Sequence, residues 1–194
     1  MKTLIFDFGG VLVDWNPHYL YDKHFGDAAK TDWFLANICT MAWNEQMDAG
    51  KPFCEGVAEL SAIHPEWARE IEMYFHRWIE MMGDEIEGMY SLLQELKEKG
   101  CPLYGLTNWS SETFCQVRDR YRIFRLLDGM VVSGEEHCLK PYPEIYHILL
   151  DRYHLNPAEC IFIDDRASNL RGAEAVGIRG ILFTGAGDLR RQLL

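Results

Sequence analysis

The sequence contains no long hydrophobic run and no paired-cysteine motif. No stretch approaches the roughly 20 apolar residues that a membrane-spanning helix needs. The apolar run at the N-terminus is interrupted by Asp7 too early for a signal peptide. The six cysteines are scattered, without a C-x-x-C pair or a His/Cys cluster at zinc spacing, which favours reduced thiols in a chain of 194 residues. We therefore expect a soluble, cytoplasmic protein without a membrane partner.

Positive charge is also scarce. Lys and Arg together number 19 against 30 Asp and Glu, and the formal net charge is -11 at pH 7. A surface this acidic repels the phosphates of nucleic acids and of anionic lipids, so we expect no nucleic-acid partner. An anionic substrate would need a local positive centre, supplied by a metal ion, a lysine or backbone N–H groups.

Internal repeats and low-complexity tracts are absent as well, and the length suits one domain or a core domain with a modest insert. Short apolar runs alternate with helical patterns, which is typical of strand–helix units on a parallel sheet. Because each run is apolar on both faces, we predict an α/β fold with a Rossmann-like parallel sheet sandwiched by helices. The predicted strands are Leu4–Phe6, Leu103–Leu106, Met130–Val132, Cys160–Ile163 and Gly180–Phe183.

The segment from Trp15 to about Gly83 has a different pattern and carries no convincing strand. Its Trp, Met and aromatic side chains recur at helical spacing, as at Trp33, Phe34 and Ile38. This pattern predicts three to four helices in a small bundle. We therefore predict a core domain of residues 1–15 and 84–194, and a small α-helical cap of residues 16–83 inserted after the first strand.

Polar residues stand at the carboxyl ends of the predicted strands, where open parallel sheets bind their ligands. Since these ends meet at one edge of the sheet, we expect their side chains to converge. Each group by itself could be explained as a turn, a helix cap or a solvated loop. The prediction of a functional site rests on the occurrence of all the groups together, in this order along the chain. The residues are Asp7, Gly9 and Gly10 after the first strand, Thr107 and Asn108 after the second, Lys140 before the helix that follows the third, and Asp164 and Asp165 after the fourth.

This combination suits phosphoryl transfer. Three carboxylates at one place repel one another unless a hard cation lies between them, and Mg²⁺ prefers oxygen ligands. The Asp7 carboxylate can attack phosphorus and form a covalent intermediate. The metal ion and Lys140 neutralise the charge that Asp7 and the phosphate bring together. Thr107 and the amides of the Gly9-Gly10 loop can donate hydrogen bonds to phosphate oxygens.

The same motifs resemble those of the haloacid dehalogenase-like hydrolase superfamily, in particular its subfamily I with a small helical cap. The family pattern is D-x-D-G-[TV] after a strand, then a strand ending in Ser or Thr, a lysine before a helix and a strand ending in an acidic pair. This sequence has Phe6-Asp7-Phe8-Gly9-Gly10-Val11, Leu106-Thr107-Asn108, Lys140-Pro141 and Ile163-Asp164-Asp165 at the corresponding places.

The resemblance implies a role for each of these residues. Asp7 would be the nucleophile and a metal ligand, and Thr107 and Lys140 would act in catalysis. Mg²⁺ would be bound by Asp7, by the backbone carbonyl of Gly9 and by Asp165 directly, and by Asp164 through water. The phosphorylated substrate would be bound by Gly10, Thr107, Asn108 and Lys140.

One position departs from the family pattern. The phosphatases of the family usually carry a second Asp two residues after the nucleophile, which protonates the leaving group and then activates water. Here that position is Gly9. Asp14, Glu45, Asp48 or a metal-polarised water could take over this role, or the substrate could have a good leaving group. The D-x-G-x-V version is similar to a bacterial branch that includes α-D-glucose-1-phosphate phosphatase, which suggests a sugar phosphate.

The leading prediction is thus a Mg²⁺-dependent phosphatase for a small phosphorylated metabolite, acting through an aspartyl phosphate. The alternative from another class is a non-catalytic protein that binds a phosphorylated metabolite, and Gly9 motivates it. Haloacid dehalogenation is disfavoured because relatives with that activity lack the acidic pair. Phosphonate cleavage would need a cap lysine such as Lys23, Lys30 or Lys51, and a mutase would rely on the missing second Asp. The segment from Trp43 to Gly50 is expected either to point into the cleft or to be cap scaffold.

Overall fold

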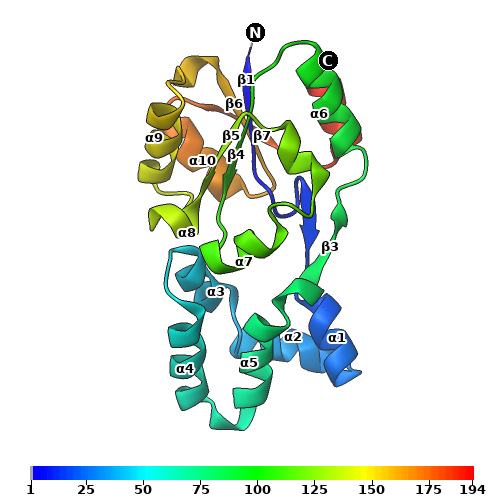
Figure 1. Ribbon diagram of the computed structural model, residues 1–194, viewed down its shortest axis with the longest axis vertical. Coiled ribbons are helices and arrows are strands. Elements are labelled where there is room, and N and C mark those ends of the chain that lie inside the picture. Colours follow the sequence, from blue (N-terminus) through cyan, green and yellow to red (C-terminus); the bar gives the residue numbers. More distant parts are fainter. Residues whose placement is uncertain (1) are drawn as a thin grey trace.

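Five parallel strands form the central sheet of the protein, for which the computed structural model describes residues 2–194 (Figure 1). The strands lie in the order β5-β4-β1-β6-β7. Each predicted strand is present within one residue at either end, and the predicted α/β fold is confirmed. The strands are β1 (Thr3–Phe6), β4 (Leu103–Thr107), β5 (Gly129–Val132), β6 (Cys160–Asp164) and β7 (Arg179–Leu182).

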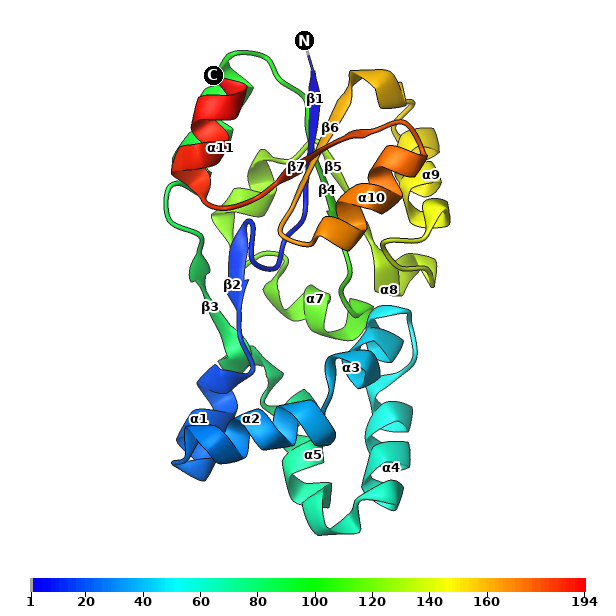
Figure 2. The ribbon, with the colours of Figure 1, turned by 180° about the vertical axis from the view of Figure 1, so that it is seen from behind.

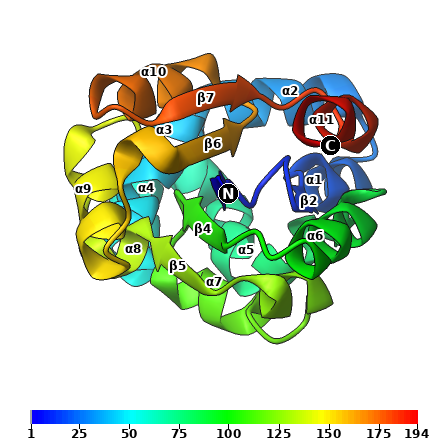
Figure 3. The ribbon, with the colours of Figure 1, turned by 90° about the horizontal axis from the view of Figure 1, so that it is seen from above.

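Helices cover both faces of this sheet, as the view along the strands shows (Figure 3). Successive side chains of a strand point to opposite faces. In β1, Leu4 and Phe6 are buried in one hydrophobic cluster and Ile5 in another. The Leu4 side is covered by α6 (Met89–Glu98) and α11 (Ala186–Leu193), and the Ile5 side by α9 (Pro143–Arg152) and α10 (Ala167–Ala175).

The remaining elements of the sheet-containing part are short. They are α7 (Ser111–Val117), α8 (Ser133–Glu136) and the 3₁₀ helices η3 (Arg122–Leu126) and η4 (Pro157–Glu159).

A group of helices lies beyond the carboxyl ends of the strands (Figure 2). The expectation of three to four helices was wrong, because residues 16–83 contain five α-helices. The first of them ends at Gly26, which has a left-handed conformation with φ 63°. They are α1 (His18–Phe25), α2 (Ala28–Asn37), α3 (Met41–Asp48), α4 (Phe53–Ile63) and α5 (Ala68–His76), with the 3₁₀ helices η1 (Pro65–Trp67) and η2 (Trp78–Met81).

Two short strands connect these helices to the sheet, and the expectation of no strand in this region was also wrong. β2 (Val13–Trp15) and β3 (Met82–Glu85) pair antiparallel, with Trp15 opposite Met82. Asp and Gly are unfavourable in strands, and both occur in these segments. The pairing joins Val13 to Glu85 and Trp15 to Met82, residues far apart in the chain, so no local pattern could reveal it.

The loop after β1 is held by the Phe8 side chain, which is fully buried. Its ring lies 4.7 Å from that of Phe124 and 5.8 Å from that of Phe114, centre to centre. Gly105 in β4 makes room for this ring, since a Cβ there would lie 2.3 Å from it. The hydrophobic core therefore fixes the backbone on both sides of Phe8, including Asp7. Within residues 2–194, no helix combines the length and the apolar character needed to cross a bilayer.

We predict that Phe162→Ala lowers the free energy of unfolding by about 3–5 kcal/mol, because the substitution leaves a cavity in the sheet core. Phe162 is fully buried, and its ring packs against Tyr146 at 5.8 Å. Leu182→Ala on the adjacent strand is the control: its side chain is 46% exposed, and we expect a change of about 0.5 kcal/mol. Urea unfolding followed by circular dichroism measures both. Equal losses would show that Phe162 is not part of a closely packed core.

Candidate active site

A pocket of about 270 Å³ lies between the carboxyl ends of the strands and helix α3. Six of the residues predicted from the sequence form part of its wall, from loops that lie more than 150 positions apart in the chain. They are Asp7, Gly9, Gly10, Asn108, Lys140 and Asp165. The two others, Thr107 and Asp164, are buried next to Asn108 and Asp165.

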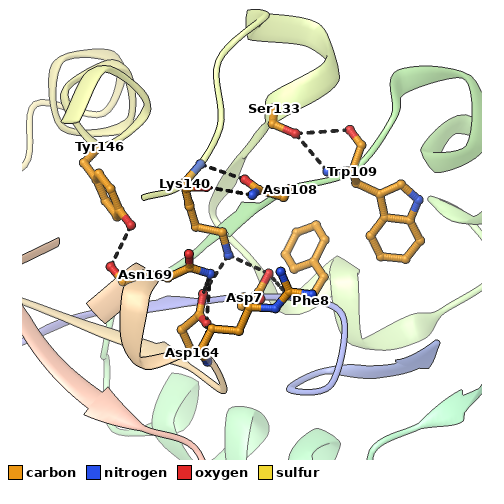
Figure 4. Close-up of polar contacts among 10 residues, drawn as sticks. Asp7, Phe8, Asn108, Trp109, Ser133, Lys140, Tyr146, Asp164 and Asn169 are labelled. Atoms are coloured by element: carbon orange, nitrogen blue, oxygen red, sulfur yellow. Dashed lines mark hydrogen bonds and ion pairs between the residues drawn. The ribbon is translucent and has the colours of Figure 1, made fainter. Parts of the chain in front are cut away.

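Asp7 has one fixed and one free carboxylate oxygen. Its Oδ1 accepts hydrogen bonds from the backbone N–H of Phe8 at 2.7 Å and contacts Nζ of Lys140 at 2.8 Å (Figure 4). Its backbone N–H donates to the carbonyl of Ile163 in the adjacent strand β6 at 2.9 Å. Among the described residues no donor binds Oδ2, so this oxygen is available to a ligand.

Lys140 lies between two carboxylates and is itself buried, with 1% of its side chain exposed. Its Nζ is 2.8 Å from Asp7 Oδ1 and 2.7 Å from Asp164 Oδ2. Asn108 holds the backbone of this lysine at both ends: its Oδ1 accepts from the Lys140 N–H at 2.8 Å, and its Nδ2 donates to the Lys140 carbonyl at 3.0 Å (Figure 4). Asn108 thus positions Lys140.

Asp164 is fully buried and accepts hydrogen bonds on both oxygens. Nδ2 of Asn169 lies 3.1 and 3.0 Å from the two oxygens, and the backbone N–H of Arg166 donates to Oδ1 at 2.8 Å. The hydroxyl of Tyr146 in turn donates to the carbonyl of Asn169 at 2.7 Å. This network holds the loop after β6 in a single arrangement around Asp164.

Burial and neighbouring charges move the pKa values of these groups in different directions. Burial raises the pKa of Asp7 to about 7, against the effect of Lys140. Burial also tends to raise the pKa of Asp164. The Lys140 charge and the hydrogen bonds to the Asp164 carboxylate outweigh this effect and hold its pKa below the usual range. Lys140 loses solvation by burial, yet Asp7 and Asp164 raise its pKa. Burial and the charge of Asp164 raise the pKa of Asp165. The Arg166 charge opposes this effect on Asp165, but the raised pKa values of Asp7 and Asp165 indicate that the two cations do not fully offset the three carboxyl groups.

The geometry of the three carboxylates fits a divalent cation. One oxygen from each of Asp7, Asp164 and Asp165 lies within 4.8 Å of the others. Gly10 allows this approach, because its φ is +75° and a Cβ there would lie 2.6 Å from Oδ2 of Asp165. An all-oxygen set of this kind suits Mg²⁺, and a cation here would offset the excess negative charge.

The Thr107 hydroxyl is a buried polar group without a partner. The residue ends β4 and is 1% exposed, and its Oγ1 forms no hydrogen bond with the described residues. A buried hydroxyl without a hydrogen bond costs about 1–3 kcal/mol. A ligand oxygen next to Thr107 would supply the missing partner.

Helix α3 supplies part of the opposite wall, through Asn44, Glu45 and Asp48. In contrast, Trp43 packs among the helices and donates its indole N–H to the Gly56 carbonyl at 3.1 Å. Asp14 is absent from the pocket wall, and its carboxylate accepts the hydroxyl of Tyr19. Of the side chains considered as substitutes for the second Asp, two therefore reach the pocket and Asp14 does not.

Several residues of the wall were not predicted from the sequence. Arg166 and Trp109 each come two residues after the end of a strand, so a wider search of the strand ends would have found them. Trp15 and Trp78 also line the pocket. They lie in or next to the paired strands β2 and β3, whose tertiary arrangement no local sequence signal reveals.

Comparisons with known proteins agree with this geometry. A family model for haloacid dehalogenase-like hydrolases matches residues 1–177. The chain is 32% identical over 184 residues to the sesquiterpene phosphatase astK of Aspergillus oryzae, which covers 94% of this chain and 90% of the relative. It is 23% identical to a phosphorylated carbohydrates phosphatase of Thermotoga maritima, over 93% of this chain and 84% of the relative.

A solved structure has the same fold over the whole chain. It is the HAD family enzyme bt-2542 of Bacteroides thetaiotaomicron in complex with magnesium and inorganic phosphate, with a TM-score of 0.74, 22% identity and 100% coverage of both chains. The family model, the relative at 32% identity and the converging strand ends lead to the same conclusion. The chain belongs to the haloacid dehalogenase-like hydrolases.

Proposed function

We propose that the protein is a Mg²⁺-dependent phosphatase that hydrolyses a small phosphorylated metabolite through an aspartyl phosphate on Asp7. The proposal rests on how the two oxygens of the Asp7 carboxylate are bound. Lys140 and the Phe8 N–H fix Oδ1, no donor among the described residues binds Oδ2, and one oxygen of Asp7 lies within 4.8 Å of one oxygen each of Asp164 and Asp165. The phosphatase names of two relatives support the same reaction class.

Each residue has a defined part in the reaction. Oδ2 of Asp7 attacks phosphorus, so that an Asp7–phosphorus bond forms, the bond to the leaving-group oxygen breaks and that oxygen takes up a proton. Water then loses a proton to the group that protonated the leaving group and attacks phosphorus, so that the Asp7–phosphorus bond breaks, inorganic phosphate is released and the carboxylate is restored. The Lys140 ammonium orients Asp7 throughout, and the Thr107 hydroxyl donates to a phosphoryl oxygen. When bound, Mg²⁺ neutralises charge on the phosphoryl group.

We assign the metal ligands as Asp7, the Gly9 carbonyl and Asp165, with Asp164 acting through water. This division is supported by the hydrogen bonds of the acidic pair. Both oxygens of Asp164 already accept hydrogen bonds from Asn169, whereas the Asp165 carboxylate lies nearer to solvent. Phosphate would be held by Gly10, Thr107 and Lys140, with Asn108 keeping Lys140 in place.

We also propose that residues 16–83 act as a cap on a core of residues 1–15 and 84–194. Support comes from α3, which forms the pocket wall opposite Asp7, and from the short β2–β3 connection. Closure of such a cap excludes water and strengthens electrostatic interactions at the site. Within the phosphatase class we favour a sugar phosphate, because Asn44, Glu45 and Asp48 make this wall polar. A cytoplasmic location fits the six free cysteines.

The proton donor for the leaving group is best sought on α3. Gly9 offers no side chain, and a Cβ there would meet no atom within 4 Å. Asp48 faces the pocket and is 8% exposed; burial raises its pKa to about 7, against the effect of the Ser110 N–H. Nδ2 of Asn44 donates to its Oδ2 at 2.9 Å. A carboxyl group with a pKa near neutrality can both give and accept a proton under working conditions.

We predict that the protein releases phosphate from p-nitrophenyl phosphate and from members of a sugar-phosphate panel, and that removal of Mg²⁺ with a chelator abolishes the activity. Asp7→Asn should lower kcat/KM by about a thousandfold or more, because the nucleophile is lost. Asp151→Asn, at an exposed position on α9, is the control. If no ester is hydrolysed but phosphate raises the melting temperature, the protein is a binding protein and the proposal fails.

We predict that Gly9→Asp increases kcat on alkyl phosphates, which have poor leaving groups, more than on p-nitrophenyl phosphate. The new carboxyl group would stand two residues after the nucleophile, and the position has open space and no positive φ. Steady-state kinetics on the two classes of ester measure the effect. An equal or negative effect on both would mean that another group already transfers the proton efficiently.

We predict that Asp48→Asn becomes more stable relative to the wild type as pH rises from 5 to 8. The folded wild type holds a proton on Asp48 up to about pH 7, whereas the unfolded chain releases it near its ordinary pKa, so wild-type stability falls as pH rises through this range. Asp188→Asn is the control: a hydrogen bond from Thr184 lowers the pKa of Asp188 from its ordinary value of 3.8, so this carboxyl group is ionised in both states and its effect should not vary between pH 5 and 8. Urea unfolding at several pH values measures both. A difference for Asp48→Asn that does not vary with pH would contradict a protonated Asp48.

A further inference from the structure

Two oppositely charged side chains face each other across the pocket, one from α3 and one from the loop after β6. The guanidinium of Arg166 lies 3.6 Å from Oε1 of Glu45, and both residues line the pocket. We infer that this pair recognises hydroxyl groups on an uncharged leaving group and sets the preference of the enzyme among phosphate esters. The inference rests on the proposed phosphatase function and extends it to the recognised part of the substrate.

The ion pair is weak enough for Glu45 and Arg166 to form hydrogen bonds with a substrate instead of with each other. Its N···O separation exceeds the length of a normal hydrogen bond, and the two side chains are 48% and 43% exposed. An ion pair of this kind contributes little to stability. Lys140, the other cation on the wall, is already bound by Asp7 and Asp164. The third N–H of Lys140 would go to the phosphate, so among the described wall residues Arg166 is the cation with donors left for the leaving group.

Both members of the pair are anchored at a defined place relative to the reaction centre. The backbone N–H of Arg166 donates to Oδ1 of Asp164 at 2.8 Å, so the guanidinium extends from a fixed loop beside the phosphate end of the pocket. Glu45 follows Asn44, whose Oδ1 accepts the Tyr74 hydroxyl at 3.1 Å inside the helical segment. A leaving group attached to a phosphate at Asp7 would therefore contact the two side chains at defined positions.

The rest of the wall supplies the complementary apolar surface. Trp15, Trp78 and Trp109 line the same pocket, and the rings of Trp78 and Trp109 pack at 5.7 Å. A hydroxylated ring has apolar C–H groups that pack on indoles and hydroxyls that hydrogen-bond to carboxylate and guanidinium groups. The tryptophans thus serve the apolar part of such a ring, and Glu45 and Arg166 its hydroxyls.

The charges of the pair argue for an uncharged leaving group. An anionic leaving group would be attracted by Arg166 but repelled by Glu45 on the opposite side of the pocket. A purely apolar leaving group would bury the pair without offering new hydrogen bonds, which is unfavourable. A neutral leaving group with several hydroxyls avoids both penalties.

The test compares kcat/KM for glucose 1-phosphate, p-nitrophenyl phosphate and farnesyl phosphate in the presence of Mg²⁺. Glu45→Ala and Arg166→Ala should each lower the ratio of the glucose 1-phosphate value to the p-nitrophenyl phosphate value by about ten- to a hundredfold, as expected for lost hydrogen bonds to charged groups. Arg166→Lys should restore only part of the ratio, since an ammonium lacks the planar set of donors.

The controls are Gln46→Ala, next to Glu45 on α3, and Arg171→Ala, an exposed arginine on the helix that follows Arg166. Neither residue lines the pocket, and the ratio should stay at the wild-type value in both. Melting temperatures establish that every variant is folded.

Two results would overturn the inference while leaving the proposed function intact. One is an equal loss on glucose 1-phosphate and p-nitrophenyl phosphate in both pair variants, which would indicate a general structural role. The other is a wild type that prefers farnesyl phosphate to glucose 1-phosphate. A wild type that hydrolyses none of the three esters with Mg²⁺ would instead overturn the proposed function itself.

Discussion

The buried ammonium of Lys140, held between Asp7 and Asp164, is the interaction on which the site depends. Asp164 is fully buried and Asp7 almost so, and two carboxylates so close together would repel each other strongly without a cation between them. The lysine keeps Asp164 charged, orients Asp7 through one oxygen and leaves the other free. Its own position is set by Asn108, whose amide holds its backbone from the end of β4. The site is thus an ion-pair network supported by three strand ends and one loop.

The sheet makes this network possible by bringing distant parts of the chain to one edge. Asp7, Asn108 and Asp164 stand at the ends of adjacent parallel strands, and the register of β1 with β4 and β6 sets their spacing. Buried side chains hold this register. Phe8 is the clearest case, since its ring fills space left by Gly105 and so fixes the loop that carries Asp7 and Gly9.

The helical segment determines what surrounds the phosphate end of the pocket. Its α3 helix brings Asn44, Glu45 and Asp48 opposite the carboxylates, and the strands β2 and β3 bring Trp15 and the neighbouring Trp78 to the same space. The wall is therefore polar on one side and aromatic on the other. Because Gly9 has no side chain that could transfer a proton, the carboxyl groups of α3 are the acidic side chains that face the Asp7 carboxylate across the pocket.

The sheet and the cluster of Asp7, Lys140, Asp164 and Asp165 could be predicted from the sequence, because each is encoded locally. A short apolar run followed by a polar residue marks a buried strand and its carboxyl end, and parallel strands bring those ends together. The order of the strands, the pairing of β2 with β3 and the number of helices depend on contacts between distant residues, which periodicity does not record. The same holds for the contact of Arg166 with Glu45 and for the exclusion of Asp14 from the pocket. The sequence by itself thus determined which charged side chains gather at the edge of the sheet, whereas only the tertiary structure decided which side chains face them across the pocket, because these come from separate elements that pack together in the folded chain.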